Sequence, residues 1–72
     1  MPNPLHSQKY QKVIKQLRKA RLEAGFTQLQ VAKKLKRHQS YVSKIEIGER
    51  RIDVAELSEL AEIYGKRLDY FV

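Results

Sequence analysis

The spacing of apolar residues after position 4 is the feature that most constrains how this chain folds. No proline follows Pro4, and apolar side chains recur every three or four residues in segments that glycines 25, 48 and 65 separate. This spacing places apolar residues on one face of an α-helix. The alternation of apolar and polar residues that is typical of strands is absent. The sequence therefore predicts an all-α protein, a compact bundle of about five short helices.

Capping residues delimit the individual helices. Ser7 is a suitable N-cap for a first helix, and Thr27 with Gln30 has the spacing of a capping box. Asp53 with Glu56 repeats that spacing later in the chain. The predicted helices span residues 8–24, 28–35, 39–47 and 53–64, and a short fifth helix holds Leu68, Tyr70 and Phe71. Residues 1–7, which include both prolines, are expected to be flexible, so that residues 8–72 form the domain.

Each predicted helix has one apolar face that we expect to be buried. Ala32 is small enough to let a second helix approach closely. The predicted core consists of Tyr10, Val13, Ile14, Leu17, Ala24, Val31, Ala32, Leu35, Val42, Ile45, Val54, Leu57, Leu60, Ala61 and Tyr64.

Basic residues are concentrated in the first part of the chain. Residues 1–51 hold 13 Lys and Arg against 3 Asp and Glu, a net charge of +10, whereas residues 52–72 hold 2 against 5, a net charge of −3. Such a basic region favours a polyanionic partner. The chain has no cysteine, which excludes disulfides and Cys-rich zinc sites. Without a signal peptide or an apolar run of roughly 20 residues, we expect a cytoplasmic protein with no membrane contact.

Two stretches of the sequence form a specific motif. They are Thr27-Gln28-x-x-Val31-Ala32-x-x-Leu35 and Ser40-Tyr41-Val42-Ser43-Lys44-Ile45-Glu46-x-Gly48-Glu49-Arg50. Together they resemble the Xre/Cro-like helix-turn-helix family of phage repressors and bacterial regulators, and the match runs from Leu17 to Asp69. The resemblance implies a lambda-repressor-like DNA-binding domain with its helix-turn-helix at about residues 27–48, in which the outward face of the 39–47 helix enters the major groove.

This resemblance implies DNA contacts along the 39–47 helix. Gln39 and Ser40 lie at its start, where we expect contacts with base edges; Gln39 suits adenine, while Ser40 alternatively bonds phosphate or caps the helix. Tyr41 is expected to contact a thymine methyl group or a phosphate, the alternative being packing against the neighbouring turn. Lys44, one turn further on, is expected to reach guanine or phosphate, and Ser43 lies on the same polar face.

A second group of residues around this helix is suited to phosphate. Thr27 and Gln28 begin the preceding helix, whose N-terminal amides favour an anion, and in the family a glutamine at the position of Gln28 also braces the reading helix. Basic residues in the flanking loops are expected to clamp phosphates or, alternatively, to form a solvated face: Arg37, His38, Arg50 and Arg51. His38 is not expected to bind a metal, because only His6 would be able to join it.

Arg21 and Glu46 match family positions that form an ion pair between the first helix and the reading helix, a structural role. The sequence departs from the family pattern at three places. Lys36 stands where glycine is usual, so a left-handed backbone there costs about 1 kcal/mol. Leu29 replaces an acidic or polar residue and is expected to be exposed, and His38 replaces the usual Ser or Thr cap.

The predicted function is that of a sequence-specific double-stranded DNA-binding transcriptional regulator, most simply a repressor that binds a pseudo-palindromic operator as a homodimer. The apolar C-terminus is expected either to form the dimer contact, as is frequent in the family, or to close the core; its residues are Leu68, Tyr70, Phe71 and Val72.

The sequence leaves one alternative function and argues against another. An antitoxin or accessory protein, whose main partner is another protein, is the alternative, and Leu29 and the aromatic C-terminus support it. An enzyme is not expected: Glu46 is committed to Arg21, which leaves no carboxylate pair suited to a metal in the basic region. No cofactor is expected.

Overall fold

The computed structural model describes residues 7–72, which form four α-helices and one short 3-10 helix. Their bounds are α1 (Gln8–Glu23), α2 (Gln28–Leu35), α3 (Gln39–Glu46), α4 (Val54–Tyr64) and η2 (Leu68–Tyr70). No strand occurs within the described range, so the all-α prediction is confirmed. The predicted flexible segment lies, apart from Ser7, outside the described residues. Within residues 7–72, each helix is too short or too polar to cross a membrane.

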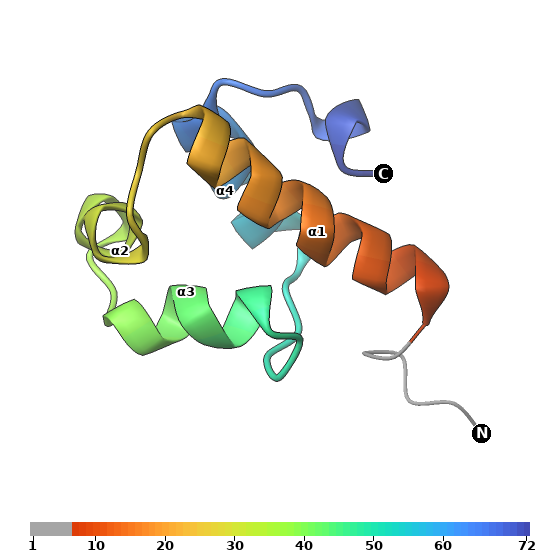
Figure 1. Cartoon of the computed structure of the whole chain (residues 1–72), viewed down its shortest axis with the longest axis horizontal. Helices are drawn as coiled ribbons and strands as arrows, with labels where there is room; N and C mark the ends of the chain where they lie inside the picture. Colours follow the sequence, from red (N-terminus) through yellow and green to blue (C-terminus); the bar gives the residue numbers. More distant parts are fainter. Residues whose placement is uncertain (1–6) are drawn as a thin grey trace.

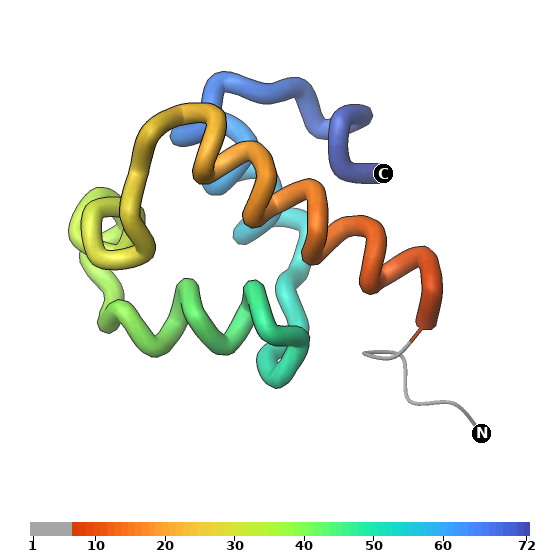
Figure 2. Tube along the Cα trace, viewed as in Figure 1, coloured from red at the N-terminus to blue at the C-terminus, as the bar shows by residue number. Residues whose placement is uncertain are grey.

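The helices are arranged around α1, which runs diagonally across the molecule (Figure 1). In that view α3 lies across the picture while α2 is seen almost along its axis, so the two helices of the helix-turn-helix cross steeply. α4 lies behind α1, and the chain after α4 turns back toward α1 (Figure 2). The Gln16 side-chain amide secures that return by donating to the Tyr70 carbonyl at 3.2 Å.

Capping bonds begin three of the four α-helices as the sequence predicts. The Ser7 hydroxyl accepts from the Tyr10 amide, and complete capping boxes start α2 at Thr27 and α4 at Asp53. His38, at the start of α3, makes no side-chain capping bond. The amide groups of the first turn of α3 are therefore without a side-chain cap, as expected for a chain with His38 in place of Ser or Thr.

In the turn between α2 and α3, a lysine adopts the left-handed backbone conformation that usually favours glycine. Lys36 has a φ of 58° and is the one non-glycine residue among 7–72 with positive φ. Its Cβ makes this conformation unfavourable by roughly 1 kcal/mol or more. The Arg37 amide, which donates to the Ala32 carbonyl at 2.9 Å, closes the turn and fixes the direction in which the chain enters α3.

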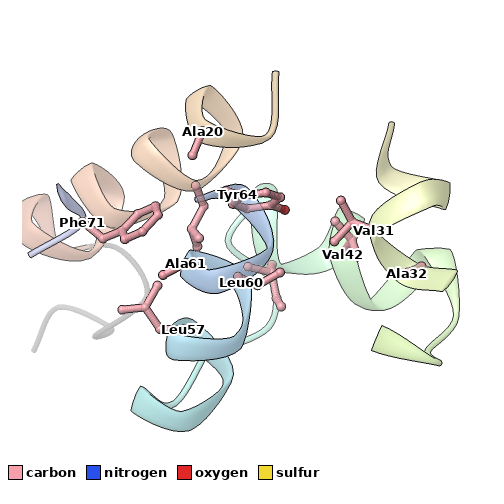
Figure 3. Packing of buried hydrophobic residues seen from close by; sticks show 11 residues of the cluster. Ala20, Val31, Ala32, Val42, Leu57, Leu60, Ala61, Tyr64 and Phe71 are labelled. Carbon is pink, nitrogen blue, oxygen red and sulfur yellow. The ribbon is translucent and has the colours of Figure 1, made fainter. Parts of the chain in front are cut away.

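The core lies where the four helices meet, and its largest fully buried side chains are Phe71, Leu17, Ile45 and Val31. Figure 3 shows Val31 and Val42 facing each other between α2 and α3, where Ala32 is fully buried as predicted. Two core predictions are wrong: Ala24 and Val54 are exposed. Ala24 is the C-cap of α1 and Val54 the first residue of α4, so both lie beyond the turns that face the core.

The number of helices is four rather than about five, because the segment after Gly65 forms only the 3-10 turn η2. Its hydrogen bonds join residues three apart, from the Tyr70 amide to the Arg67 carbonyl and from the Phe71 amide to the Leu68 carbonyl. This tight turn directs Phe71, which is fully buried, toward the side of α4 that carries Leu57 and Ala61 (Figure 3). The apolar C-terminus therefore closes the core through Phe71.

Candidate nucleic-acid interface

The outward face of α3 is polar and exposed within the part of the chain that the structure describes, residues 7–72. Val42 and Ile45 are buried and anchor the inner face of the helix. Gln39, Ser40 and Lys44 are exposed on the outside. The side chains of Gln39 and Lys44 make no hydrogen bond or ion pair with any residue in the range 7–72. Ser43 is half-buried, and its hydroxyl donates to the Ser40 carbonyl at 3.4 Å.

A buried ion pair fixes α3 against α1. The Arg21 guanidinium donates from Nε to Oε2 of Glu46 at 2.7 Å and from Nη2 to Oε1 at 3.0 Å. A third N–H, on Nη1, donates to the Phe26 carbonyl at 2.9 Å. The hydrogen bonds to Glu46 raise the pKa of Arg21, although burial acts in the opposite direction. This two-pronged geometry restrains the rotation of α3 about its own axis, and with it the direction of its outer face.

Gln28 adds a brace from α2. Its side-chain amide donates to Oε1 of Glu46 at 3.1 Å, so the same carboxylate joins α1, α2 and α3. Thr27, just before Gln28, is exposed, and its hydroxyl oxygen accepts from the Gln30 amide at 3.1 Å. The hydroxyl proton of Thr27 is not used in that bond and is available to an outside acceptor such as a phosphate oxygen.

Tyr41 is held against the start of α4 rather than directed freely outward. The side chain is half-buried, and its hydroxyl donates to Oε2 of Glu56 at 2.8 Å. Burial and this hydrogen bond raise the pKa of Tyr41 to about 12, so the hydroxyl remains a donor at neutral pH. The Tyr41 side chain packs against the core and its hydroxyl is bonded to Glu56, as the packing alternative describes, while its contact with DNA remains a prediction.

Glu56 is the centre of a second cluster, which includes Arg50. Arg50 donates from Nη1 to Oε1 at 3.2 Å, and its Nη2 lies 3.1 Å from Oε2. The Asp53 amide also donates to Oε1, at 3.0 Å. Burial alone would raise the pKa of Glu56, but the Asp53 amide, Arg50 and the Tyr41 hydroxyl outweigh it and lower the pKa to about 2. Glu56 is therefore ionised throughout the neutral range.

The other basic residues predicted for the interface lie at the two ends of α3. Arg37 and His38 precede the helix, Arg51 follows it, and all three are exposed. The guanidinium carbons of Arg37 and Arg50 lie over the Tyr41 ring, at 4.7 and 4.5 Å from its centroid. Among residues 7–72, no three His, Asp or Glu side chains are placed to hold a metal ion, and His6 lies outside that range.

Two residues that support the interface were not identified as such from the sequence. The Tyr10 hydroxyl accepts from the Ile52 amide at 2.9 Å and donates to the Arg50 carbonyl at 3.4 Å, so α1 fixes the loop after α3. Glu56 was recognised only as a capping residue. The apolar face of α1 already accounts for a tyrosine at position 10, and the capping box of α4 accounts for a glutamate at position 56. No sequence signal therefore pointed to their partners far along the chain.

The four residues predicted for a dimer contact differ in accessibility. Phe71 is fully buried and Tyr70 is half-buried. Leu68 and Val72 are exposed, at 38% and 73% of their surface. A partner subunit is therefore able to contact Leu68 and Val72 directly, whereas Phe71 belongs to the core of its own chain.

The comparison with known proteins agrees with this geometry. A family model described as helix-turn-helix matches residues 17–71, most of the chain. The match begins at the buried Leu17 of α1 and ends at Phe71, so it includes both ends of α3 and every buried hydrophobic residue among 7–72 except Ile14. No curated protein and no solved structure matches the chain.

Proposed function

The chain belongs to the Xre/Cro-like helix-turn-helix family of DNA-binding regulators, and we propose that it is a sequence-specific transcriptional regulator of double-stranded DNA, most simply a repressor in the cytoplasm. The outer face of α3 is the observation that carries this proposal. Among residues 7–72 this face is polar and exposed at Gln39, Ser40 and Lys44, while Val42, Ile45 and Glu46 hold the opposite side of the helix.

Base recognition is assigned to the exposed residues of α3. Gln39 and Ser40, in the first turn, are nearest to base edges when such a helix enters the major groove. A glutamine amide suits adenine N6 and N7, and the ammonium group of Lys44 suits guanine O6 and N7. Because the Arg21–Glu46 pair and Gln28 fix the helix, the backbone positions from which these side chains project are fixed as well.

Phosphate contacts are assigned to the rim of this face, chiefly to Thr27, Arg37, His38 and Arg51. Their side chains are exposed and lie at the ends of α2 and α3. The regulator is proposed to bind a pseudo-palindromic operator as a homodimer, because a single module of this size buries a modest DNA interface and a two-fold site doubles it. The exposed Leu68 and Val72 are the contacts proposed for that dimer.

Random-site selection, followed by sequencing of the bound DNA, tests this function. The expected result is an enriched sequence with two-fold symmetry and half-sites about one helical turn, or a multiple of it, apart. On that DNA, Gln39→Ala and Lys44→Ala are each expected to weaken binding by about 1–3 kcal/mol.

Matched controls separate base contacts from general charge and helix effects. Lys12→Ala removes the same charge from the exposed surface of α1, and Gln8→Ala alters a glutamine at the first position of a helix, as Gln39→Ala does. Both controls are expected to bind like the parent protein. The proposal is wrong if selection enriches no sequence, or if Gln39→Ala and Lys44→Ala behave like these controls.

One observation favours a second candidate, an accessory protein or antitoxin. Leu22 and Leu29 are exposed and line a common hollow with Phe26, beside Gln39. Its apolar part, which Thr27, Gln28 and Gln39 border, suits an apolar side chain of a partner protein or a thymine methyl group. Leu29→Gln discriminates between them. Unchanged affinity for the operator would favour a protein partner at the hollow, whereas reduced affinity would indicate that Leu29 contacts the duplex.

A further inference from the structure

Two arginines from opposite ends of α3 meet on one aromatic ring. Arg37 precedes the helix and Arg50 follows it, yet both guanidinium groups lie within 4.7 Å of the Tyr41 ring centroid. The contacts are alike, but the hydrogen bonds of the two arginines are not. This difference separates two residues that the sequence assigned to the same phosphate clamp.

Most hydrogen-bond donors of the Arg50 guanidinium are used within the protein. Its Nη1 donates to Glu56 at 3.2 Å and to the Arg51 carbonyl at 2.9 Å, and its Nη2 lies 3.1 Å from the second carboxylate oxygen of Glu56. The adjacent carboxylate neutralises the charge of Arg50 locally. A phosphate would have to compete with Glu56 for the N–H donors and for the positive charge of Arg50. Arg50 is therefore a poor anion ligand in this arrangement.

Arg37 has the opposite character. Its side chain is exposed and makes no hydrogen bond or ion pair with residues 7–72; its contact is with the face of the Tyr41 ring. A contact between a guanidinium and an aromatic ring does not require hydrogen bonds, so the N–H donors of Arg37 remain available to an anion. The backbone of Arg37 is fixed as well, because its amide donates to the Ala32 carbonyl at 2.9 Å.

The ring on which Arg37 rests is held in place. The Tyr41 hydroxyl donates to Glu56 at 2.8 Å, and Glu56 is itself held by Arg50 and by the Asp53 amide. A platform fixed in this way reduces the side-chain freedom that Arg37 loses on binding, which favours affinity.

We propose that Arg37, rather than Arg50, binds a phosphate at this interface and that Tyr41 is the positioning residue of Arg37, whereas Arg50 has the structural role of locking Tyr41 through Glu56. This inference rests on the proposed function, since the ligand is a backbone phosphate of the bound duplex. It assigns different roles to Arg37 and Arg50 and makes Tyr41 a platform rather than a base contact.

Salt titrations of binding to the selected duplex test the assignment. Each phosphate contact contributes about 0.9 to the slope of log affinity against log salt concentration. Arg37→Gln is therefore expected to reduce the slope by about that amount. Arg50→Gln and the matched charge control Arg67→Gln, at an exposed position near the C-terminus, are expected to leave the slope unchanged.

A double-mutant cycle tests the role of Tyr41. Tyr41→Leu removes the platform, so Arg37→Gln is expected to cost less affinity in that background than in the parent. Tyr41→Phe keeps the ring and is expected to retain most of the coupling. Arg37→Lys retains the charge without the flat fork, and we expect it to keep the salt slope but to lose affinity.

The outcomes separate this inference from the proposed function. If the parent protein binds no duplex selectively, both fail. If the parent binds its selected DNA but Arg37→Gln leaves the salt slope unchanged, or if the effects of Arg37→Gln and Tyr41→Leu are independent, the function stands and this inference is overturned. The slope test requires only a substitution at an exposed residue, so it remains decisive if Tyr41→Leu fails to fold.

Discussion

Two arginine–glutamate pairs involve α3 and the loop that follows it, and they differ in burial. The Arg21–Glu46 side chains retain 9% and 4% of their exposure, whereas those of Arg50 and Glu56 retain 37% and 14%. Each pair has a third polar partner, Gln28 in the first and Tyr41 in the second. The same chemistry thus holds α3 from the inside and the loop after α3 at the surface.

The difference in burial determines what each pair contributes to stability. Desolvation offsets much of the attraction within a buried pair, so its net stabilisation is small although breaking it is costly. An exposed ion pair contributes little to the free energy of unfolding, typically about 0–1 kcal/mol, and little is lost when it is broken. We therefore expect Arg21–Glu46 to govern folding and orientation, and Arg50–Glu56 to act mainly on the loop and on Tyr41.

The largest effect is expected from Glu46→Ala. It leaves the Arg21 guanidinium buried without a counter-charge, and removes the acceptor of Gln28, which should reduce the free energy of unfolding by about 3–5 kcal/mol. Chemical denaturation followed by circular dichroism measures this loss. In a domain this small, such a loss removes a large part of the total stability.

A double replacement is the control for this result. Arg21→Met with Glu46→Leu removes both charges and is expected to be much less destabilising than Glu46→Ala alone. If the double variant loses as much stability as the sum of the two single variants, the pair does not act as a buried unit.

A smaller effect is expected from Glu56→Gln, which should reduce the free energy of unfolding by about 1–2 kcal/mol at neutral pH. The substitution weakens a partly exposed network of charged hydrogen bonds. The pKa of Glu56 is lowered from an ordinary value of 4.5 to about 2. A lowered pKa means that the stabilisation is complete above pH 4.5 and is lost as the pH falls toward 2. Glu56→Gln should remove this part of the acid dependence.

Urea denaturation at several pH values between 7 and 2 measures that difference between the parent protein and Glu56→Gln. Glu59→Gln is the matched control, since Glu59 is an exposed glutamate on the same helix. We expect Glu59→Gln to follow the parent curve. An equally steep acid dependence in Glu56→Gln and the parent would mean that the Arg50–Glu56 cluster does not stabilise the fold.

The smallest effect on stability is expected from a substitution in the turn between α2 and α3, because it leaves both ion pairs intact. Lys36→Gly relieves a left-handed backbone at φ 58° and should raise stability by about 0.5–1 kcal/mol. Lys33→Gly, in the interior of α2, should instead lower stability by about 1 kcal/mol. Thermal unfolding compares the two; destabilisation by both substitutions would contradict the backbone account of Lys36.

The sequence predicted the first pair and missed the roles of the second for a physical reason. Helix bounds and caps depend on neighbouring residues, so they were predictable to within one residue. The left-handed backbone at Lys36 was expected only through the family resemblance, which places glycine there. Arg21 and Glu46 occupy positions that the family resemblance marks. The path of the loop after α3, by contrast, depends on Tyr10 of α1, which binds Ile52 from far along the chain.

That loop decides where several predicted site residues lie. With Arg50 and Glu56 brought beside it, Tyr41 packs inward, although its position on α3 suggested an outward aromatic side chain. The exposed polar residues Gln39, Ser40 and Lys44 were predictable because helical periodicity alone places them opposite Val42 and Ile45. Their DNA contacts remain predictions.

The central claim is that the outer face of α3 meets duplex DNA, and mapping amide chemical shifts during titration with the selected duplex tests it most directly. We predict the largest changes at Gln39, Ser40 and Lys44 and at the start of α2, with little change at Glu59 and Glu62 on the exposed surface of α4. The claim is contradicted if the changes concentrate on α4 and the C-terminal segment while the amides of α3 keep their positions.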